Sequence, residues 1–563
     1  MKKFLRFCFR AAHLFTEFML LLFMGFAVYI GIVVSVAIPE PEDMSSLELE
    51  RETVGEHQYR IGNNWSVLND HGIWEAYVEG EPFERGVIYG KLLQESVHAQ
   101  EVFFVDQIEK IVPSATWRFF LKVMIAYFNR DMDHYVPYEY QEEIYGVSFS
   151  FSDEFDYVGP KYYRILNYHA AHDIGHALEE YNMVGCTSFS VKDEFSENQQ
   201  LLVGRNFDFY MGDEFSEDKV LTFVNPSEGH QFAMYSWAGL MGVVSGMNTE
   251  GVCVTINAAK SDLPTKTKTP ISILTREILQ YASNIDEAVE IAKKREVFVS
   301  ETIMLTSAND NKTVLIEKSP EAVDVYESEN GKVLCTNHYQ SDHFEKTEIN
   351  QENIKNSDSQ YRYDRLTELI SDKQPLNLDD AISILRNQKG TDNEDLGWGN
   401  PKAINQLIAH HSIVFEPQEH KMWISTAPYQ LGNFICYDLD EVFSKAPSRD
   451  LNEQLYIDSL TVAEDPFVKT KTYQNFEYFK TIKKKLFDSY MLGIEFNLSD
   501  QERERYINSN KNSYVTYMTL GQYYLDLEKF DLAKGYFEEA LTKEVASINE
   551  ENKIKNLIDE CKH

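Results

Sequence analysis

The stretch Gly185-Cys186-Thr187-Ser188 combines residue types that suit self-cleavage followed by amide hydrolysis. A glycine before a cysteine exposes the preceding carbonyl to the thiol, which allows an N-to-S acyl shift from amide to thioester. Hydrolysis of that thioester would leave Cys186 as a new N-terminus with a thiol and a free α-amine. Because an α-amine has a pKa of about 7.7–8.0, it can serve as the base for its own thiol. The pattern alone also fits a buried cysteine that begins a strand.

Four motifs after the cysteine and one before it give this pattern a context. Those that follow are Gly204-Arg205-Asn206-Phe207-Asp208, Gly246-Met247-Asn248 leading to Asn257, Cys335-Thr336-Asn337-His338 and Tyr361-Arg362-Tyr363. The one upstream is Gly80-Glu81-Pro82-Phe83-Glu84-Arg85-Gly86. In this order and spacing, the chain from roughly Ile73 to Asp438 resembles the cysteine N-terminal-nucleophile (Ntn) hydrolases typified by isopenicillin N acyltransferase (acyl-coenzyme A:6-aminopenicillanic acid acyltransferase). Choloylglycine hydrolases are more distant relatives.

The resemblance implies an α+β fold, a four-layer αββα sandwich, with Cys186 as both nucleophile and base. Arg205 would lie beside the thiol, where a fixed positive charge lowers the thiol pKa. Asp208 would accept a hydrogen bond from the α-amine and orient it. A structural ion pair between Arg205 and Asp208 is the alternative interpretation.

The same resemblance assigns the remaining site residues to charge stabilisation. Asn257 and Asn337 would donate amide hydrogen bonds to the oxyanion of the tetrahedral intermediate, and Arg362 would stabilise charge in the same pocket. Ala258 is the alternative to Asn257, because the spacing from Asn248 differs by one from that of the bile-salt branch. Asn337 could instead be a turn residue.

The N-terminal residues 1–39 predict a membrane anchor. A basic flank precedes an uncharged apolar stretch of 21 residues, Phe18 to Ile38, which is long enough to span a hydrocarbon core of about 30 Å as a helix. The basic flank would stay cytoplasmic, so the bulk of the chain would be extracytoplasmic. A cleaved signal peptide, with Ser35-Val36-Ala37 as its cleavage site, is the rival interpretation.

Changes in composition and in hydrophobic pattern divide the rest of the chain into four parts. We expect a linker at 40–71, a helical propeptide-like segment at 72–185, the catalytic domain at 186–440 and a helical region at 441–563. In the last part, one tetratricopeptide-like repeat is indicated by Leu520, Gly521, Tyr524, Ala533, Phe537 and Ala540. Since one repeat cannot bury its own face, it would pack against neighbouring helices or the core, or bind a protein partner.

Composition and motifs limit the partners and cofactors that we expect the chain to bind. The net charge of −37 argues against nucleic acid, and the chain carries no phosphate-cradling glycine loop. Six dispersed cysteines form neither a disulfide framework nor a zinc motif. His169, His172 and His176 are spaced to share one helix face, which we interpret as polar surface rather than a zinc site. We expect no cofactor and no metal.

The sequence therefore predicts an exported, membrane-tethered, self-processing cysteine amide hydrolase or acyltransferase. Its substrate would be a small-molecule amide or N-acyl compound, and the two self-cleaved chains would stay associated. Two rivals remain open: a non-catalytic binding module that kept the sandwich, and a chain whose Gly185–Cys186 bond stays intact.

Overall fold

Two β-sheets form the centre of the computed structural model, which describes residues 36–170, 173, 185–260, 262, 264, 266–328 and 330–562. The larger sheet has 11 strands in the order β1-β2-β3-β4-β7-β8-β9-β10-β11-β12-β13, and the smaller has six in the order β14-β5-β6-β15-β16-β17. Neighbouring strands are antiparallel except for the parallel pair β4 and β7. The larger sheet consists of β1 (Glu52–Gly55), β2 (Gln58–Ile61), β3 (Asn64–Leu68), β4 (Trp74–Gly80), β7 (Lys219–Pro226), β8 (Phe232–Trp237), β9 (Ser245–Asn248), β10 (Val252–Ala258), β11 (Glu301–Ser307), β12 (Lys312–Lys318) and β13 (Val323–Glu327). The smaller consists of β14 (Lys332–Cys335), β5 (Thr187–Val191), β6 (Leu202–Phe207), β15 (His411–Glu416), β16 (Lys421–Ser425) and β17 (Phe434–Asp438).

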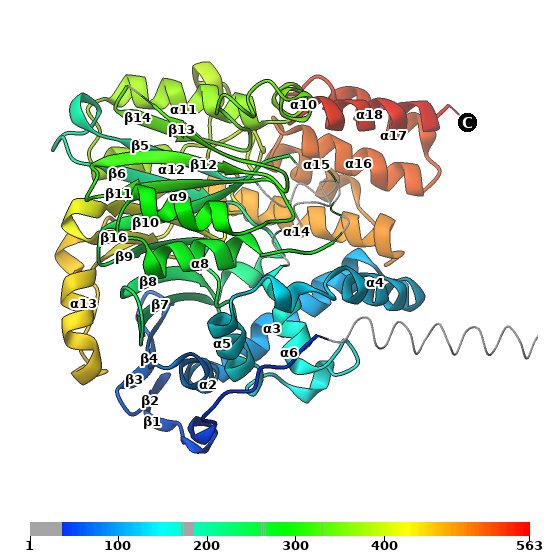
Figure 1. Ribbon diagram of the computed structural model, residues 1–563. Helices are drawn as coiled ribbons and strands as arrows, with labels where there is room; N and C mark the ends of the chain where they lie inside the picture. The colour runs from blue at the N-terminus through cyan, green and yellow to red at the C-terminus, as the bar shows by residue number, and fades with distance from the viewer. Residues whose placement is uncertain are drawn as a thin grey trace, which may run out of the picture.

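The two sheets pack face to face around an apolar core. Leu221 and Met304 of the larger sheet share one cluster with Ile413 and Ile424 of the smaller sheet. Because side chains alternate along a strand, the other face of each sheet needs a second cover. Helices supply that cover on both outer faces (Figure 1).

Helices α8 (Ile271–Tyr281) and α9 (Ile285–Lys294) cover the larger sheet, and α11 (Ser359–Lys373) and α12 (Leu378–Leu385) cover the smaller one. Two N-caps fix where these helices begin. The side chain of Asn284 accepts from the Glu287 N–H, and Asn377 forms a capping box with Asp380. The predicted mixed α+β class is confirmed.

The N-terminal part differs from the expectation of a linker and a purely helical segment. Residues 52–68 form β1 to β3, and β4 continues the same sheet. Strand β1 is exposed and shows no alternation of buried and exposed residues. The sequence therefore carries little of the period-two pattern that indicates a strand. The helices that follow are α2 (Pro82–Leu92), α3 (Gln94–Ile111), α4 (Ala115–Phe128), α5 (Tyr138–Ser148) and α6 (Lys161–His169).

Glycines bring α2 and α5 into close contact. A Cβ at Gly86 would lie 2.0 Å from the Glu143 carbonyl oxygen, and one at Gly146 would lie 2.4 Å from the Phe83 carbonyl oxygen. Neither neighbour could move without shifting backbone. Gly86 of the upstream motif therefore serves helix packing.

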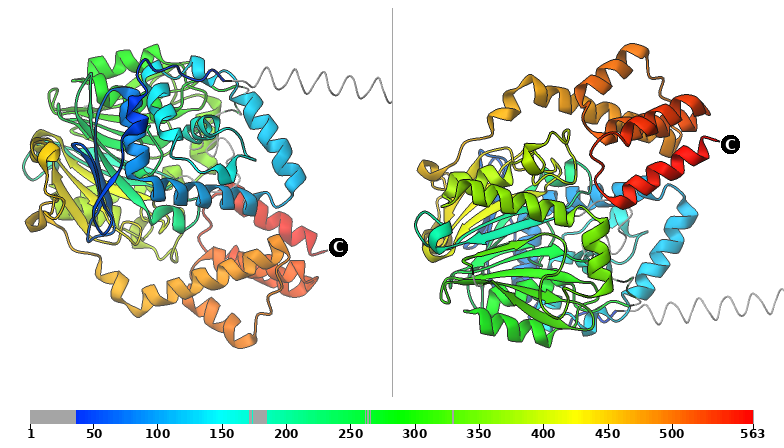
Figure 2. Two further views of the ribbon diagram at one scale, coloured as in Figure 1. Left: turned by 90° about the horizontal axis from the view of Figure 1, so that it is seen from below. Right: turned by 90° about the horizontal axis from the view of Figure 1, so that it is seen from above.

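The C-terminal helices form a separate cluster beside the sheets (Figure 2). They are α14 (Lys471–Leu492), α15 (Asp500–Ser509), α16 (Tyr514–Asp526), α17 (Phe530–Ala540) and α18 (Ile548–Glu560), while α10 (Glu348–Asn356) and α13 (Leu439–Lys445) belong to the sheet domain. Leu407, Tyr429 and Leu431 of the sheet domain join this cluster, so the tail docks on the core. The helical character of the tail agrees with expectation, and its assignment as a tetratricopeptide repeat stays a prediction.

Among the residues that the structure describes, no helix is both long and apolar enough to cross a membrane. The predicted anchor, Phe18 to Ile38, lies outside the described residues except for its last three positions.

Candidate active site

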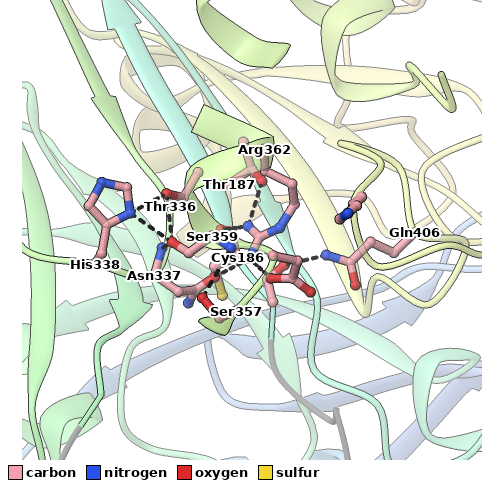
Figure 3. A network of polar contacts seen from close by, with 12 residues as sticks. Cys186, Thr187, Thr336, Asn337, His338, Ser357, Ser359, Arg362 and Gln406 are labelled. Carbon is pink, nitrogen blue, oxygen red and sulfur yellow. Dashed lines mark hydrogen bonds and ion pairs between the residues drawn. The ribbon is translucent and has the colours of Figure 1, made fainter. Parts of the chain in front are cut away.

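Cys186 lies directly before β5, with its side chain fully buried. The N–H of Gly185 donates to the backbone carbonyl of Asp208 over 2.9 Å, which holds the Gly185–Cys186 peptide against the end of β6. The close view in Figure 3 shows the polar side chains that converge on Cys186 from the smaller sheet, from α11 and from the loop before β15.

Arg205 stands next to the thiol. It is on β6, paired across the ladder with Ser188, and its Nη2 lies 3.7 Å from the Cys186 Sγ. The same guanidinium donates to the carbonyls of Val244 (3.0 Å) and Ile256 (2.6 Å). These carbonyl contacts hold a fully buried cation in one orientation.

Burial outweighs the arginine in setting the thiol pKa. Loss of solvent raises the pKa of Cys186 to about 11, while the Arg205 charge lowers it by less. Arg205 thus acts in the predicted direction, but in the uncut chain the thiol is protonated at neutral pH.

The side-chain carboxyl of Asp208 has fewer hydrogen bonds than the other polar groups of the site, among the described residues. Both carboxylate oxygens are buried and have no hydrogen-bond partner within the described part of the chain. Burial raises the pKa of Asp208 to about 8, and the charges of Arg362 and Arg205 oppose that rise. Such a carboxyl can accept a donor that the uncut chain does not offer.

Arg362 and Asn337 form a bridge to the cysteine backbone. From α11, Arg362 donates through Nη1 to the Cys186 carbonyl (2.7 Å) and through Nη2 to the Asn337 Oδ1 (2.7 Å). Asn337 in turn donates to the carbonyl of Ala258 over 2.8 Å. The structure therefore brings Cys186, Arg205, Asp208, Asn337 and Arg362 together.

Asn257 is engaged elsewhere. Its Nδ2 donates to the carbonyls of Cys335 (3.3 Å) and Thr336 (3.1 Å), and its Oδ1 accepts from the Ser188 hydroxyl (2.9 Å). Both amide hydrogens are thus used to tie β10 to the end of β14. In this arrangement Asn257 offers no hydrogen to an oxyanion on Cys186.

Gln406 is a site residue that sequence reasoning missed. It is buried in the loop before β15, and its Nε2 donates to the Gly185 carbonyl over 3.2 Å. A Cβ at Gly185 would lie 2.7 Å from that nitrogen, so only glycine leaves room for this contact. No motif marks Gln406, because its role depends on a contact 221 residues away in sequence.

A second missed group holds Asn337 in place. The Ser359 Oγ accepts from the Asn337 N–H over 2.8 Å and lies 2.8 Å from the His338 Nδ1. Burial lowers the pKa of His338 to about 4, so its ring is neutral near neutral pH. Ser359 and His338 therefore act as supports rather than as acids or bases.

His169 of the histidine motif does not lie on the polar surface that the sequence predicted. His169 is fully buried and uses both ring nitrogens, with Nδ1 on the Ile165 carbonyl (2.8 Å) and Nε2 accepting from the Met241 N–H (2.9 Å). His172 and His176 lie outside the described residues. In the part of the chain described, no group of three or more His, Cys, Asp or Glu side chains could hold a metal ion.

A cavity of about 490 Å³ opens close to this site. Its lining includes Ser300, Tyr339, Phe344 and Lys268. Ser300 is tied to the β10 end, because its carbonyl accepts from the Ala259 N–H over 3.0 Å. The cavity therefore borders the end of β10, where the Ala258 carbonyl accepts from Asn337. Its volume can hold a small organic molecule.

Comparison with known sequences finds a family match over the segment that contains most of these site residues. Residues 195–428 match the family model "Acyl-coenzyme A:6-aminopenicillanic acid acyl-transferase", a segment that begins after Cys186 and contains the other site residues. Among curated proteins, the chain is 23% identical over 298 residues to Protein dcd1A of Dictyostelium discoideum (48% of this chain, 63% of the relative). It is 26% identical over 238 residues to the N-acylethanolamine-hydrolyzing acid amidase of Caenorhabditis elegans (39% of this chain, 61% of the relative). The chain thus spans less than two thirds of the length of these relatives.

Solved structures give low similarity scores. The Caenorhabditis elegans N-acylethanolamine-hydrolyzing acid amidase ortholog aligns with a TM-score of 0.32 at 18% identity, covering 41% of this chain and 93% of that one. A conjugated bile acid hydrolase from Clostridium perfringens gives 0.31 at 12% identity, covering 50% and 97%. The sequence matches show that residues 195–428 are similar to the acyl-coenzyme A:6-aminopenicillanic acid acyltransferase family and that the chain has an amidase among its relatives.

Proposed function

We propose that this chain is a self-processing cysteine amide hydrolase or acyltransferase that works through a thioester on Cys186. The surroundings of the Gly185–Cys186 bond carry the proposal. A donor, Gln406, contacts its carbonyl, and a fixed cation lies 3.7 Å from the adjacent thiol. The buried carboxyl of Asp208 has no partner in the described chain, and the backbone carbonyl of the same residue accepts from the Gly185 N–H.

In the processing step, the Cys186 sulfur attacks the Gly185 carbonyl carbon. A C–S bond forms, the C–N bond breaks, and the thiol proton ends on the released Cys186 nitrogen. Water then hydrolyses the thioester, which leaves a Gly185 carboxylate and restores the thiol. Gln406 would stabilise the oxyanion that develops on the Gly185 oxygen.

In turnover, the new α-amine acts as the base for the thiol and Asp208 accepts its hydrogen bond. The acyl part of an N-acyl amide passes to Cys186, and water or an amine then removes it. Asn337 and Arg362 would act on the substrate carbonyl, and both Arg362 and Asn257 would first have to release some of their present partners. Hydrolysis is favoured, because coenzyme A thioesters are scarce outside the cell and we expect the chain to be exported.

Intact mass and N-terminal sequencing of the full chain test this proposal. We expect a fragment that begins Cys-Thr-Ser-Phe, and we expect Cys186→Ala to abolish both cleavage and turnover of N-acyl amides. Cys253→Ala and Cys335→Ala are matched controls, because both residues are buried in the core between the sheets and should affect neither. An uncut wild-type chain would contradict the proposal and favour a non-catalytic binding module.

A further inference from the structure

Helix α4 presents an apolar surface that the described protein leaves uncovered. None of its 14 residues is buried. Trp117 and Phe119 are 64% and 66% exposed, and Phe120, Met124 and Tyr127 are exposed as well. Soluble surfaces seldom expose so many large apolar side chains together, so this helix marks an interaction site.

The helix is nevertheless held firmly at both ends. The Ser114 hydroxyl caps its N-terminus by accepting from the Trp117 N–H. At its C-terminus, Phe128 packs against Phe298 at an edge-to-face angle of 71°, and Asn129 donates to Asn167 over 2.8 Å. These contacts at both ends therefore hold the apolar face of α4 in a fixed position on the protein.

The first residues that the structure describes, beginning at Val36, lie at the C-terminal end of α4. Val36 is buried, its carbonyl accepts from the Tyr163 hydroxyl (2.8 Å), and the Ala37 N–H donates to Asp133 (2.9 Å). Asp133 is five residues beyond the last residue of α4, and Figure 2 shows the first described residues beside that end of the helix. Residues 18–35, which carry no charge, connect to Val36 without a linker.

This connection fixes the distance between the protein body and any bilayer that the apolar run enters. If residues 18–35 cross a bilayer as the sequence predicts, the C-terminal end of α4 would lie at the membrane surface and its exposed face would lie within reach of the acyl chains. The charge pattern agrees. Residues 110–130 carry four basic and no acidic side chains in a protein of net charge −37, and two of the four, Arg118 and Arg130, pair with Glu109 and Asp131 at the ends of this segment. Basic side chains beside aromatic ones are typical of helices at a lipid interface.

We infer that α4 lies in the interface of a lipid bilayer, with Trp117, Phe119, Phe120 and Met124 inserted among the acyl chains. The contact is independent of the chemistry proposed for Cys186. It orients the sheet domain relative to the membrane, because α4 and the entry point of the chain are both fixed to the same body.

Tryptophan fluorescence of the full chain in phosphatidylcholine vesicles tests the inference. Trp117 is the one exposed tryptophan among six, all of them in the described part of the chain. Vesicles with brominated acyl chains should quench the wild-type protein, and Trp117→Phe should remove at least half of that quenching. The control Trp398→Phe changes a partly buried tryptophan of the C-terminal cluster and should leave it.

Two results would overturn the inference. One is equal quenching of the wild-type and Trp117→Phe proteins. The other is a vesicle-bound protein in which Trp117 is unquenched and two copies crosslink through α4, which would make the face a dimer contact. Neither result bears on cleavage after Gly185, so the inference can fail while the proposed enzyme stands.

Discussion

At the level of single residues, desolvation and charge oppose each other around Cys186. Burial raises the pKa of the thiol to about 11 and that of Asp208 to about 8, although Arg205 is beside both. Before cleavage, the site therefore holds a neutral thiol and a largely neutral carboxyl. Cleavage would add an amine that can become a cation, and Asp208 is then the natural partner for its charge.

Gln406 should accelerate the processing step. In Gln406→Leu the side-chain volume is kept but the donor to the Gly185 oxygen is lost, so we expect cleavage to slow by about 10²–10³. Time-resolved intact mass of freshly synthesised chain measures this. Gln430→Leu is the matched control, because Gln430 is also fully buried in a neighbouring loop and has no recorded contact with Gly185. Cleavage of Gln406→Leu at the wild-type rate would contradict this role.

Asp208 should make the uncut chain less stable as pH rises. Its pKa is about 8 when folded and about 3.9 when unfolded, so between these values the native state holds a proton that the unfolded state has lost. The free energy of unfolding should then fall by about 1.4 kcal/mol per pH unit from this group. Urea unfolding of Cys186→Ala from pH 4.5 to 7.5 should show this fall, and Cys186→Ala/Asp208→Asn should lack it. Parallel curves for the two chains would refute the assignment.

Sequence reasoning placed five of the six expected site residues in one cluster and missed what lies between them. Arg205, Asp208 and Arg362 could be found because they belong to short motifs shared with the family that the chain resembles, the first motif running through β6 to Asp208 and the second lying at the start of α11. Gln406, Ser359 and His338 act by contacts with backbone groups distant in sequence, which no local spacing encodes. Spacing along the sequence also does not predict that the Asn257 amide is occupied by two carbonyls.

At the level of elements, the crossing of α16 and α17 depends on a missing side chain. A Cβ at Gly521 would lie 2.4 Å from the Phe537 ring, whereas one at Gly535 would meet nothing within 4 Å. Replacing either glycine by alanine is therefore the same substitution in neighbouring helices, but we expect the two replacements to change stability in opposite directions.

Gly521→Ala should destabilise the C-terminal cluster by about 1–3 kcal/mol, because the added methyl group overpacks the crossing. Gly535→Ala should stabilise it by up to about 1 kcal/mol, because alanine favours an exposed helical position. Thermal unfolding followed by circular dichroism measures both. Equal shifts of the two variants would show that the crossing tolerates a wider separation.

Helices and central strands were easier to predict than edges. Helix α9 buries Ile285, Ala288 and Ala292 at helical spacing, and β10, β11 and β12 are buried runs rich in apolar residues, so the sequence of these elements carries a clear pattern. Strands β1 to β3 lie in the segment that the sequence predicted as a linker, because β1 is exposed and the few apolar side chains that anchor the segment, Ile61, Trp65 and Val67, do not form a regular alternation. Their place in the sheet is decided by pairing with β4, which is a tertiary effect.

At the scale of the whole molecule, the cut after Gly185 would divide a single folded body. The segment before it contributes β4, which pairs with β7 over seven residues. It also contributes Glu143, whose buried carboxylate binds Arg276 of the later segment at 3.1 Å. Separating the two chains would expose this sheet edge and this charge, which is costly.

The two fragments should therefore remain together after cleavage. Native size-exclusion chromatography of the cleaved protein should show one species that contains both chains, and 6 M guanidinium should separate them. Two separate native peaks would contradict the expected interlocking through β4.

The position of β4 has a further consequence. Because residues before Cys186 form part of the central sheet, they are a permanent half of the protein and not a leader to be discarded. The two halves, 1–185 and 186–563, can then be supplied as separate polypeptides that complement each other by strand pairing. In such a split protein the nucleophile would become an N-terminal residue once the initiator methionine is removed, with no cleavage after Gly185, and maturation and turnover would become genetically separable.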